Sequence, residues 1–173
     1  MILFAKNSEA RRGFTLVELI VAVGIFGMVM ALAVGIFVKL LRTQRAVVAL
    51  IAMNDNASLA LEQVAREIRT GSGFSLTQGG LNFFNAKGEA VRYALDQNAI
   101  GRSVAQGPIR HITGNNVMVD RLDFTLTGSA PNGLPDGLQP RIVIVLSVSA
   151  VASEAAGVVN HYQTAVSPRL LDS

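Results

Sequence analysis

The chain has 173 residues, half of them hydrophobic and only 6% aromatic, and it contains no cysteine. This length allows one domain plus an anchor, and the lack of cysteine excludes disulfides, thiolate zinc sites and a cysteine nucleophile. The net charge of +3 is concentrated near the N-terminus, because the chain from Ala46 onward carries nine basic and ten acidic side chains. A body so close to neutral does not indicate a general nucleic-acid-binding surface.

The first predicted element is a membrane-spanning helix. Residues 1–13 form a short basic segment, and the stretch from Leu19 to Val38 contains no charged side chain. A helix of this length spans about 30 Å, which matches the hydrocarbon thickness of a bilayer. A cleaved signal peptide, an uncleaved anchor and a specialised precursor all fit this pattern. Three basic side chains flank the segment on each side, so the distribution of charge leaves its orientation open.

Glu18 is a single acidic side chain at the start of this apolar segment. An acidic residue at the centre of a membrane helix costs about 2.5–3.5 kcal/mol on insertion scales, and less near the helix end. Such a residue is a functional candidate unless it simply reaches the lipid headgroups. The sequence therefore singles out Glu18 as a residue that needs a partner.

The run Gly13-Phe14-Thr15-Leu16-Val17-Glu18-Leu19-Ile20, preceded by Arg11-Arg12, resembles the processing signature of type IV prepilins and type II secretion pseudopilins. The resemblance implies that a membrane-embedded prepilin peptidase cleaves between Gly13 and Phe14 and that the new Phe14 amine is N-methylated. It also implies that residues 1–13 are a cytoplasmic leader. The chain would then be a single-pass protein of the bacterial inner membrane whose C-terminal domain faces the periplasm or exterior, before it enters a filament.

The resemblance also implies that Glu18 pairs with the Phe14 amine of a neighbouring subunit during assembly. Opposite charges about 4 Å apart attract by about 4 kcal/mol at an effective dielectric near 20, which offsets the insertion cost of the acid. The implied partners are the prepilin peptidase, other pilin or pseudopilin subunits, the inner-membrane assembly platform, and the lipid bilayer before assembly. Many family members have proline where this chain has Gly35, so close helix packing and local melting both stay open there.

The helix is predicted to continue to about Thr70 with an amphipathic second half. The apolar residues of this half recur every three or four positions, namely Leu50, Met53, Ala57, Leu61, Val64 and Ile68. Glu62 and Arg66 form a favourable pair on the polar side, and Gly71 to Gly73 provide a stop. The predicted organisation is a leader at 1–13, a transmembrane assembly helix at 14–38, its amphipathic continuation at 39–70, and a β-rich domain at 71–173.

The pattern after Gly73 predicts antiparallel strands and hence an α+β, pilin-like fold with the helix packed on a sheet. The expected strands are Leu81–Phe84, Ala90–Leu95, Asn116–Leu126, Arg141–Val151 and Val158–Val166. Asn85 to Gly88 reads as a hairpin turn between the first two.

Catalytic, cofactor-binding and metal sites are not expected, and the chain is not predicted to be an enzyme. His111 and His161 are interpreted as surface or hydrogen-bonded histidines. Asp120 and Asp123 are predicted to point to opposite faces of a strand. Asp136 lies in a Gly- and Pro-rich loop, where an ordinary turn is favoured over a calcium ligand.

The leading hypothesis is a structural minor pilin or pseudopilin of a type IV pilus or a type II secretion pseudopilus, located at the filament tip. Leu59–Arg69 and Gln163–Arg169 resemble segments of the J-type pseudopilins and W-type minor pilins. The alternative is a DNA-uptake or adhesive pilin that binds a ligand through its globular domain, although the near-neutral body gives no support to nucleic acid as a partner.

Overall fold

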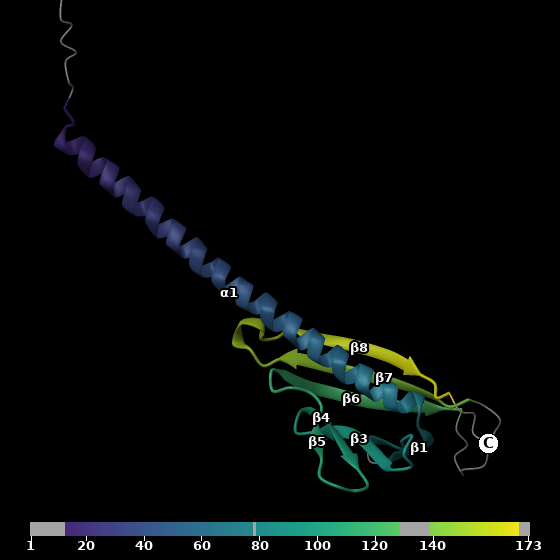
Figure 1. Cartoon of the computed structure of the whole chain (residues 1–173). Helices are drawn as coiled ribbons and strands as arrows, with labels where there is room; N and C mark the ends of the chain where they lie inside the picture. Colours follow the sequence, from purple (N-terminus) through teal and green to yellow (C-terminus); the bar gives the residue numbers. More distant parts are fainter. Residues whose placement is uncertain (1–12, 78, 129–138, 170–173) are drawn as a thin grey trace, which may run out of the picture. The chain divides into compact units, whose positions relative to one another are not determined.

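A computed structural model describes residues 13–77, 79–128 and 139–169. In these residues one long helix is followed by eight strands (Figure 1). The helix, α1, runs from Leu16 to Arg69 and has 54 residues, which confirms the single long helix predicted from the sequence. The strands are β1 (Ser72–Thr77), β2 (Gly80–Phe84), β3 (Ala90–Asp96), β4 (Ala99–Val104), β5 (Arg110–His111), β6 (Val117–Thr127), β7 (Arg141–Ala150) and β8 (Val159–Val166), with a 3₁₀ turn, η1, at Ser153–Ala155.

The chain divides into two compact units, one ending at Arg42 and the other beginning at Thr43. In the first unit, every described residue is exposed, including the apolar side chains of α1. This part of α1 is long and apolar enough to cross a membrane, and its apolar residues are not buried against the rest of the chain. Exposed apolar surface of this extent marks a membrane-binding or protein-binding segment.

The second unit is built around the amphipathic half of α1. Five helix residues are buried at helical spacing, namely Met53, Ala57, Ala60, Val64 and Ile68. They belong to one hydrophobic core with residues from the strands, such as Tyr93 and Leu146. The predicted apolar stripe is thus confirmed as the face that packs on the sheets, and the predicted ion pair between Glu62 and Arg66 forms with an N–O distance of 2.8 Å.

The strands form two antiparallel sheets instead of the one sheet expected. One has the order β1-β2-β3-β4-β5 and the other β6-β7-β8. The predicted hairpin turn joins β2 and β3, and the Asn85 side-chain oxygen accepts bonds from the backbone N–H groups of Lys87 and Glu89. The α+β class with a long helix on antiparallel sheets is therefore confirmed, and the core lies between α1 and both sheets.

Three strands, β1, β4 and β5, escaped prediction for identifiable reasons. β1 begins inside the Gly71–Gly73 segment that reads as a helix stop, and its pairing with β2 is irregular between Ser72 and Ser75. β4 follows a tight turn in which Gln97 and Asn98 both have positive φ, 46° and 59°. These angles are typical of a type I′ hairpin turn, which usually contains a glycine that makes it recognisable in the sequence. The Gln-Asn pair lacks that glycine. β5 has only two residues.

The prediction that Asp120 and Asp123 face opposite sides of a strand was wrong. The pairing of β6 with β7 shifts between Val119 and Arg121, which identifies a β-bulge at Asp120. A bulge adds one residue to a strand and resets the alternation of its side chains. Asp120 accepts a bond from the Ser149 hydroxyl, and Asp123 pairs with Arg121, so both carboxylates are engaged at the exposed face of the strand.

A partly buried ion pair links α1 to the five-stranded sheet. The Arg102 guanidinium donates from Nη2 to Glu67 Oε1 at 2.8 Å and from Nε to Glu67 Oε2 at 3.1 Å. The Tyr93 hydroxyl donates to the same Oε2 at 2.9 Å. The hydrogen bond to Glu67 raises the pKa of Arg102, and burial, followed by the negative charge of Glu67, raises the pKa of Tyr93. This cluster fixes the end of α1 on the sheet.

Candidate functional site

The N-terminal end of α1 is the first candidate site, and it begins with a capped turn. Gly13, Phe14 and Thr15 precede the helix. The Thr15 hydroxyl oxygen accepts a bond from the backbone N–H of Glu18 at 3.2 Å, and the Thr15 carbonyl accepts one from Leu19 at 3.1 Å. Thr15 is thus the N-cap residue, with an acidic residue three positions later, which is the Thr-x-x-Glu spacing of a capping box. The sequence-based predictions omit this cap, although its spacing is visible in the sequence.

Glu18 lies in the first turn of α1. Its carboxylate is therefore near the positive end of the helix dipole, where a negative charge is stabilised by about 0.3–1 kcal/mol. Among the described residues no ion pair involves Glu18, and its side chain is exposed. The structure thus gives Glu18 a local role in starting the helix and leaves its carboxylate accessible to a group on another molecule.

Gly13 and Phe14 are both accessible. A methyl group added at Gly13 would meet no other atom within 4 Å, so packing in the described part of the chain does not require glycine there. A requirement for glycine would have to come from something that approaches the backbone from outside, as a protease does. The Phe14 side chain is 78% exposed. Residues 1–12, the greater part of the predicted leader, lie outside the described residues.

Three glycines in the apolar half of α1 are also free of packing. Gly24, Gly27 and Gly35 have no atom within 4 Å of the position that a Cβ would take. Each glycine in a helix interior costs about 1 kcal/mol relative to alanine, and the described part of the chain gives no packing that compensates for this. Small residues allow close approach of neighbouring helices in a membrane or filament. At Gly35, both close packing and local melting stay open.

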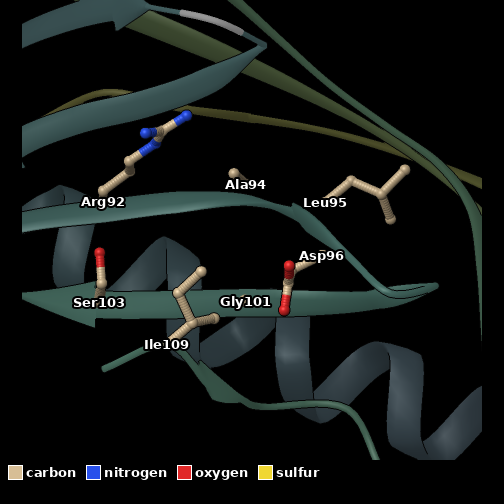
Figure 2. A pocket seen from close by; sticks show the side chains of 7 residues that line it. All are labelled: Arg92, Ala94, Leu95, Asp96, Gly101, Ser103 and Ile109. Carbon is tan, nitrogen blue, oxygen red and sulfur yellow. The ribbon is translucent and has the colours of Figure 1, made fainter. Parts of the chain in front are cut away.

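A second candidate site is a hollow of about 200 Å³ on the five-stranded sheet (Figure 2). It is lined by Arg92, Ala94, Leu95, Asp96, Gly101, Ser103 and Ile109. Arg92 lies directly opposite Ser103 in the register of β3 and β4, and Ala94 lies opposite Gly101. A Cβ at Gly101 would lie only 2.7 Å from Ile109 Cγ2, so glycine keeps the floor of the hollow open. The lining offers a cation, a carboxylate and a hydroxyl to a small polar group.

Both histidines have hydrogen-bonding partners, as expected from the sequence. His111 Nε2 lies 2.8 Å from Asp96 Oδ2 beside the hollow, and His161 Nδ1 lies 2.7 Å from the Ser147 hydroxyl across β7 and β8. Within residues 13–77, 79–128 and 139–169, no three His, Cys, Asp or Glu side chains are grouped so that they could hold a metal ion. Asp136, the weak calcium candidate, lies outside the described residues.

Comparison with known proteins identifies the N-terminal segment. A family model described as the prokaryotic N-terminal methylation motif matches residues 10–34. No curated protein and no solved structure matches the chain. The motif is type IV pilin-like and indicates a pilin or pseudopilin that prepilin peptidase processes and that assembles with other pilins. It suggests a structural role for the chain rather than an enzymatic one.

Proposed function

We propose that the chain is a minor pilin or pseudopilin of the J-type or W-type group, incorporated at the tip of a type IV pilus or a type II secretion pseudopilus. The observation that carries the proposal is the N-terminal end of α1. There the methylation motif at residues 10–34 coincides with an exposed Phe14, an accessible Glu18 and an uncovered apolar helix. The domain packed on the second half of the helix is the part that a filament would display.

Processing follows from the accessible Gly13–Phe14 bond. Prepilin peptidase cleaves this bond, removes residues 1–13 and methylates the new amine of Phe14. The leader stays in the cytoplasm, residues 14–38 span the inner membrane, and residues 39–70 continue the helix into the domain at 71–173. That domain faces the periplasm or the exterior, and the assembly platform moves the processed subunit from the bilayer into the filament.

The negative charge of Glu18 has a second role in assembly, in addition to stabilising the start of α1. The processed chain begins with the Phe14 amine, and Glu18 of the adjacent subunit pairs with it inside the apolar layer. The attraction of about 4 kcal/mol at 4 Å and an effective dielectric near 20 exceeds the insertion cost of the acid. The pair also fixes the axial register, because it joins one position on each helix.

The experiment that tests this role replaces Glu18 by glutamine and measures incorporation of the processed chain into isolated filaments. Glutamine keeps the size of the side chain and one acceptor oxygen but removes its charge. We expect normal cleavage at Gly13 and at least a ~10-fold loss of incorporation, which corresponds to only ~1.4 kcal/mol. Asp55→Asn, at an exposed position in the second half of α1, is the matched control. Unchanged incorporation of Glu18→Gln would refute the pairing.

The second candidate function is a DNA-uptake or adhesive pilin, and the hollow in Figure 2 is the feature that favours it. Arg92 and Ser103 lie on neighbouring strands of this hollow, and Asp96 is at its other end. Such groups bind phosphate, carboxylate or hydroxyl groups of a ligand. Residues 43–173 contain every residue of the hydrophobic core, so this fragment is suitable for a test of DNA binding at physiological salt. Binding that Arg92→Ala abolishes would favour this second function.

A further inference from the structure

Among the residues that the structure describes, strand β8 is an edge strand without the usual protection. It pairs with β7 on one side, and within the described chain no strand pairs with its other side. Val159–Val166 contain no proline, glycine, lysine, arginine or acidic residue, and the register with β7 is regular over the whole strand. Natural proteins normally block such edges with charges, proline, bulges or a covering element, because an open edge binds other strands.

The other sheet edges in the described residues do carry such protection. β1 has an irregularity between Ser72 and Ser75, and β5 has only two residues. β6 contains the bulge at Asp120, and its outer edge is bonded through the Val119 N–H to the Asn98 carbonyl at 2.8 Å. Among the described edge strands, β8 is therefore the one without protection. An unprotected edge of this kind can pair with a strand of another chain, which indicates a binding site.

A groove of about 370 Å³ lies beside β8 and is lined by residues of this strand and of the second half of α1. Leu61 and Ala65 contribute to it from the helix, and Tyr162 and Thr164 contribute from the strand. The Tyr162 hydroxyl donates to Asn54 Oδ1 at 2.6 Å, which holds the ring in place. A strand added to the edge of β8 would direct alternate side chains into this groove, because side chains alternate between the faces of a sheet.

The groove carries an excess of positive charge. Arg66 and Arg69 line it together with Glu62, and the carboxylate of Glu62 pairs with Arg66. No ion pair involves Arg69 among the described residues. The backbone N–H of Arg169 donates to the Arg69 carbonyl at 3.0 Å, so the end of the helix is fixed beside the strand. An acidic side chain on an incoming segment would complement Arg69.

We propose that β8 and this groove bind an extended segment of a neighbouring filament subunit, which adds a fourth strand to the three-stranded sheet. The segment places an apolar side chain on Leu61 and Ala65 and an acidic side chain near Arg69. The inference rests on the proposed function, because the partner is a subunit of the same filament. A second copy pairing through its own β8 would supply no acid, since Val159–Val166 contain none, and we therefore assign the segment to a different subunit.

Amide hydrogen exchange tests this pairing in the full chain, measured alone in detergent and again in isolated filaments. In an antiparallel pair only alternate amides of a strand bond to its neighbour. We therefore expect at least ~10-fold slower exchange, on filament entry, at the alternate β8 amides that do not face β7. Thr164→Glu, which places a negative charge in the groove and repels the acidic side chain of the incoming segment, should abolish this slowing. Thr125→Glu, on an exposed position of β6, should leave it unchanged, and exchange in β7 reports that each variant is folded.

The outcomes separate the inference from the proposed function. If the chain enters filaments and β8 exchanges as fast as in the free chain, the pairing is refuted while the filament role stands. If the chain does not enter filaments, both are refuted. If β8 exchange in the isolated chain becomes slower as the concentration of the chain increases, β8 pairs between copies. This result would contradict the assignment to a different subunit.

Discussion

Glu67 holds α1 on the five-stranded sheet, and its replacement by glutamine should destabilise the domain substantially. Its two carboxylate oxygens accept three bonds from Arg102 and Tyr93, at 2.8, 3.1 and 2.9 Å. The Glu67 side chain is 25% exposed and that of Arg102 is 22% exposed. Glutamine removes the negative charge and leaves the Arg102 guanidinium without a counterion in a largely buried position.

The expected magnitude follows from this burial. Breaking a fully buried ion pair by removing one partner costs about 3–5 kcal/mol, and a hydrogen bond to a charged group contributes about 1.5–3 kcal/mol. Since both side chains retain some contact with water, we expect Glu67→Gln to lower the free energy of unfolding by ~2 kcal/mol. The pair of Glu62 and Arg66 is also 2.8 Å long, but its side chains are 64% and 76% exposed, so Glu62→Gln should cost less than ~0.5 kcal/mol.

Urea unfolding of residues 43–173, followed by circular dichroism, measures both variants. With a slope of about 2 kcal/mol per molar urea, Glu67→Gln should lower the unfolding midpoint by about 1 M, and Glu62→Gln by less than about 0.3 M. Equal shifts for the two variants would refute the reasoning, because they would show that burial does not determine the strength of these pairs.

Three further predictions concern the cap, the packing and the pH dependence. Thr15→Val removes the capping oxygen and should cost the first turn of α1 ~1 kcal/mol, seen as faster amide exchange of Glu18 in detergent; unchanged exchange would argue against the cap. Gly71→Ala places a Cβ 2.6 Å from a ring carbon of Phe83 and should cost about 1–3 kcal/mol in urea unfolding, whereas the neighbouring Ser72→Ala should have little effect. The raised pKa of Tyr93 means that the folded domain keeps a proton that the unfolded chain loses near pH 10. Stability should therefore fall as pH rises above about 10, and the fall should be shallower in Tyr93→Phe; an equally steep fall in that variant would contradict this assignment.

The helix and its buried face were predictable because both depend on local pattern. Of the predicted apolar positions, Met53, Ala57, Val64 and Ile68 are buried. Leu50 and Leu61 are half-buried against the same core. The Gly71–Gly73 stop coincides with the helix end at Arg69. Hydrophobic periodicity of this length is the strongest structural signal in a sequence. The strand positions from β6 to β8 followed from alternation and apolar runs for the same reason.

The turn before β4, the bulge in β6 and the ion pair of Glu67 with Arg102 depend on contacts that the local sequence pattern does not specify. The turn at Gln97 and Asn98 uses positive φ angles without glycine, and the bulge at Asp120 is defined only by the register of β6 against β7. The network of Glu67 and Arg102 joins residues 35 positions apart. Long-range pairings of this kind arise from the tertiary fold, and local propensity does not specify them.

The N-terminal candidate site was the reverse case, in which the sequence carried nearly all of the signal. Gly13, Phe14 and Glu18 were predicted from the resemblance of residues 13–20 to the prepilin signature, and the family model matches residues 10–34, which include this segment. The structure added the Thr15 cap and thereby a second, local reason for an acidic residue at position 18. The hollow between β3 and β4 and the groove beside β8 required the structure, because their residues meet only after folding.

The most direct test of the account is the mass and N-terminal sequence of the chain purified from membranes of cells that contain prepilin peptidase. The account predicts a mature chain that begins at Phe14. One methyl group replaces a hydrogen of the Phe14 amine, so this chain is heavier than the unmodified fragment by one CH2 unit. In cells without the peptidase, the chain should keep residues 1–13. A mature N-terminus at any other residue, or an unprocessed chain in the presence of the peptidase, would contradict the account.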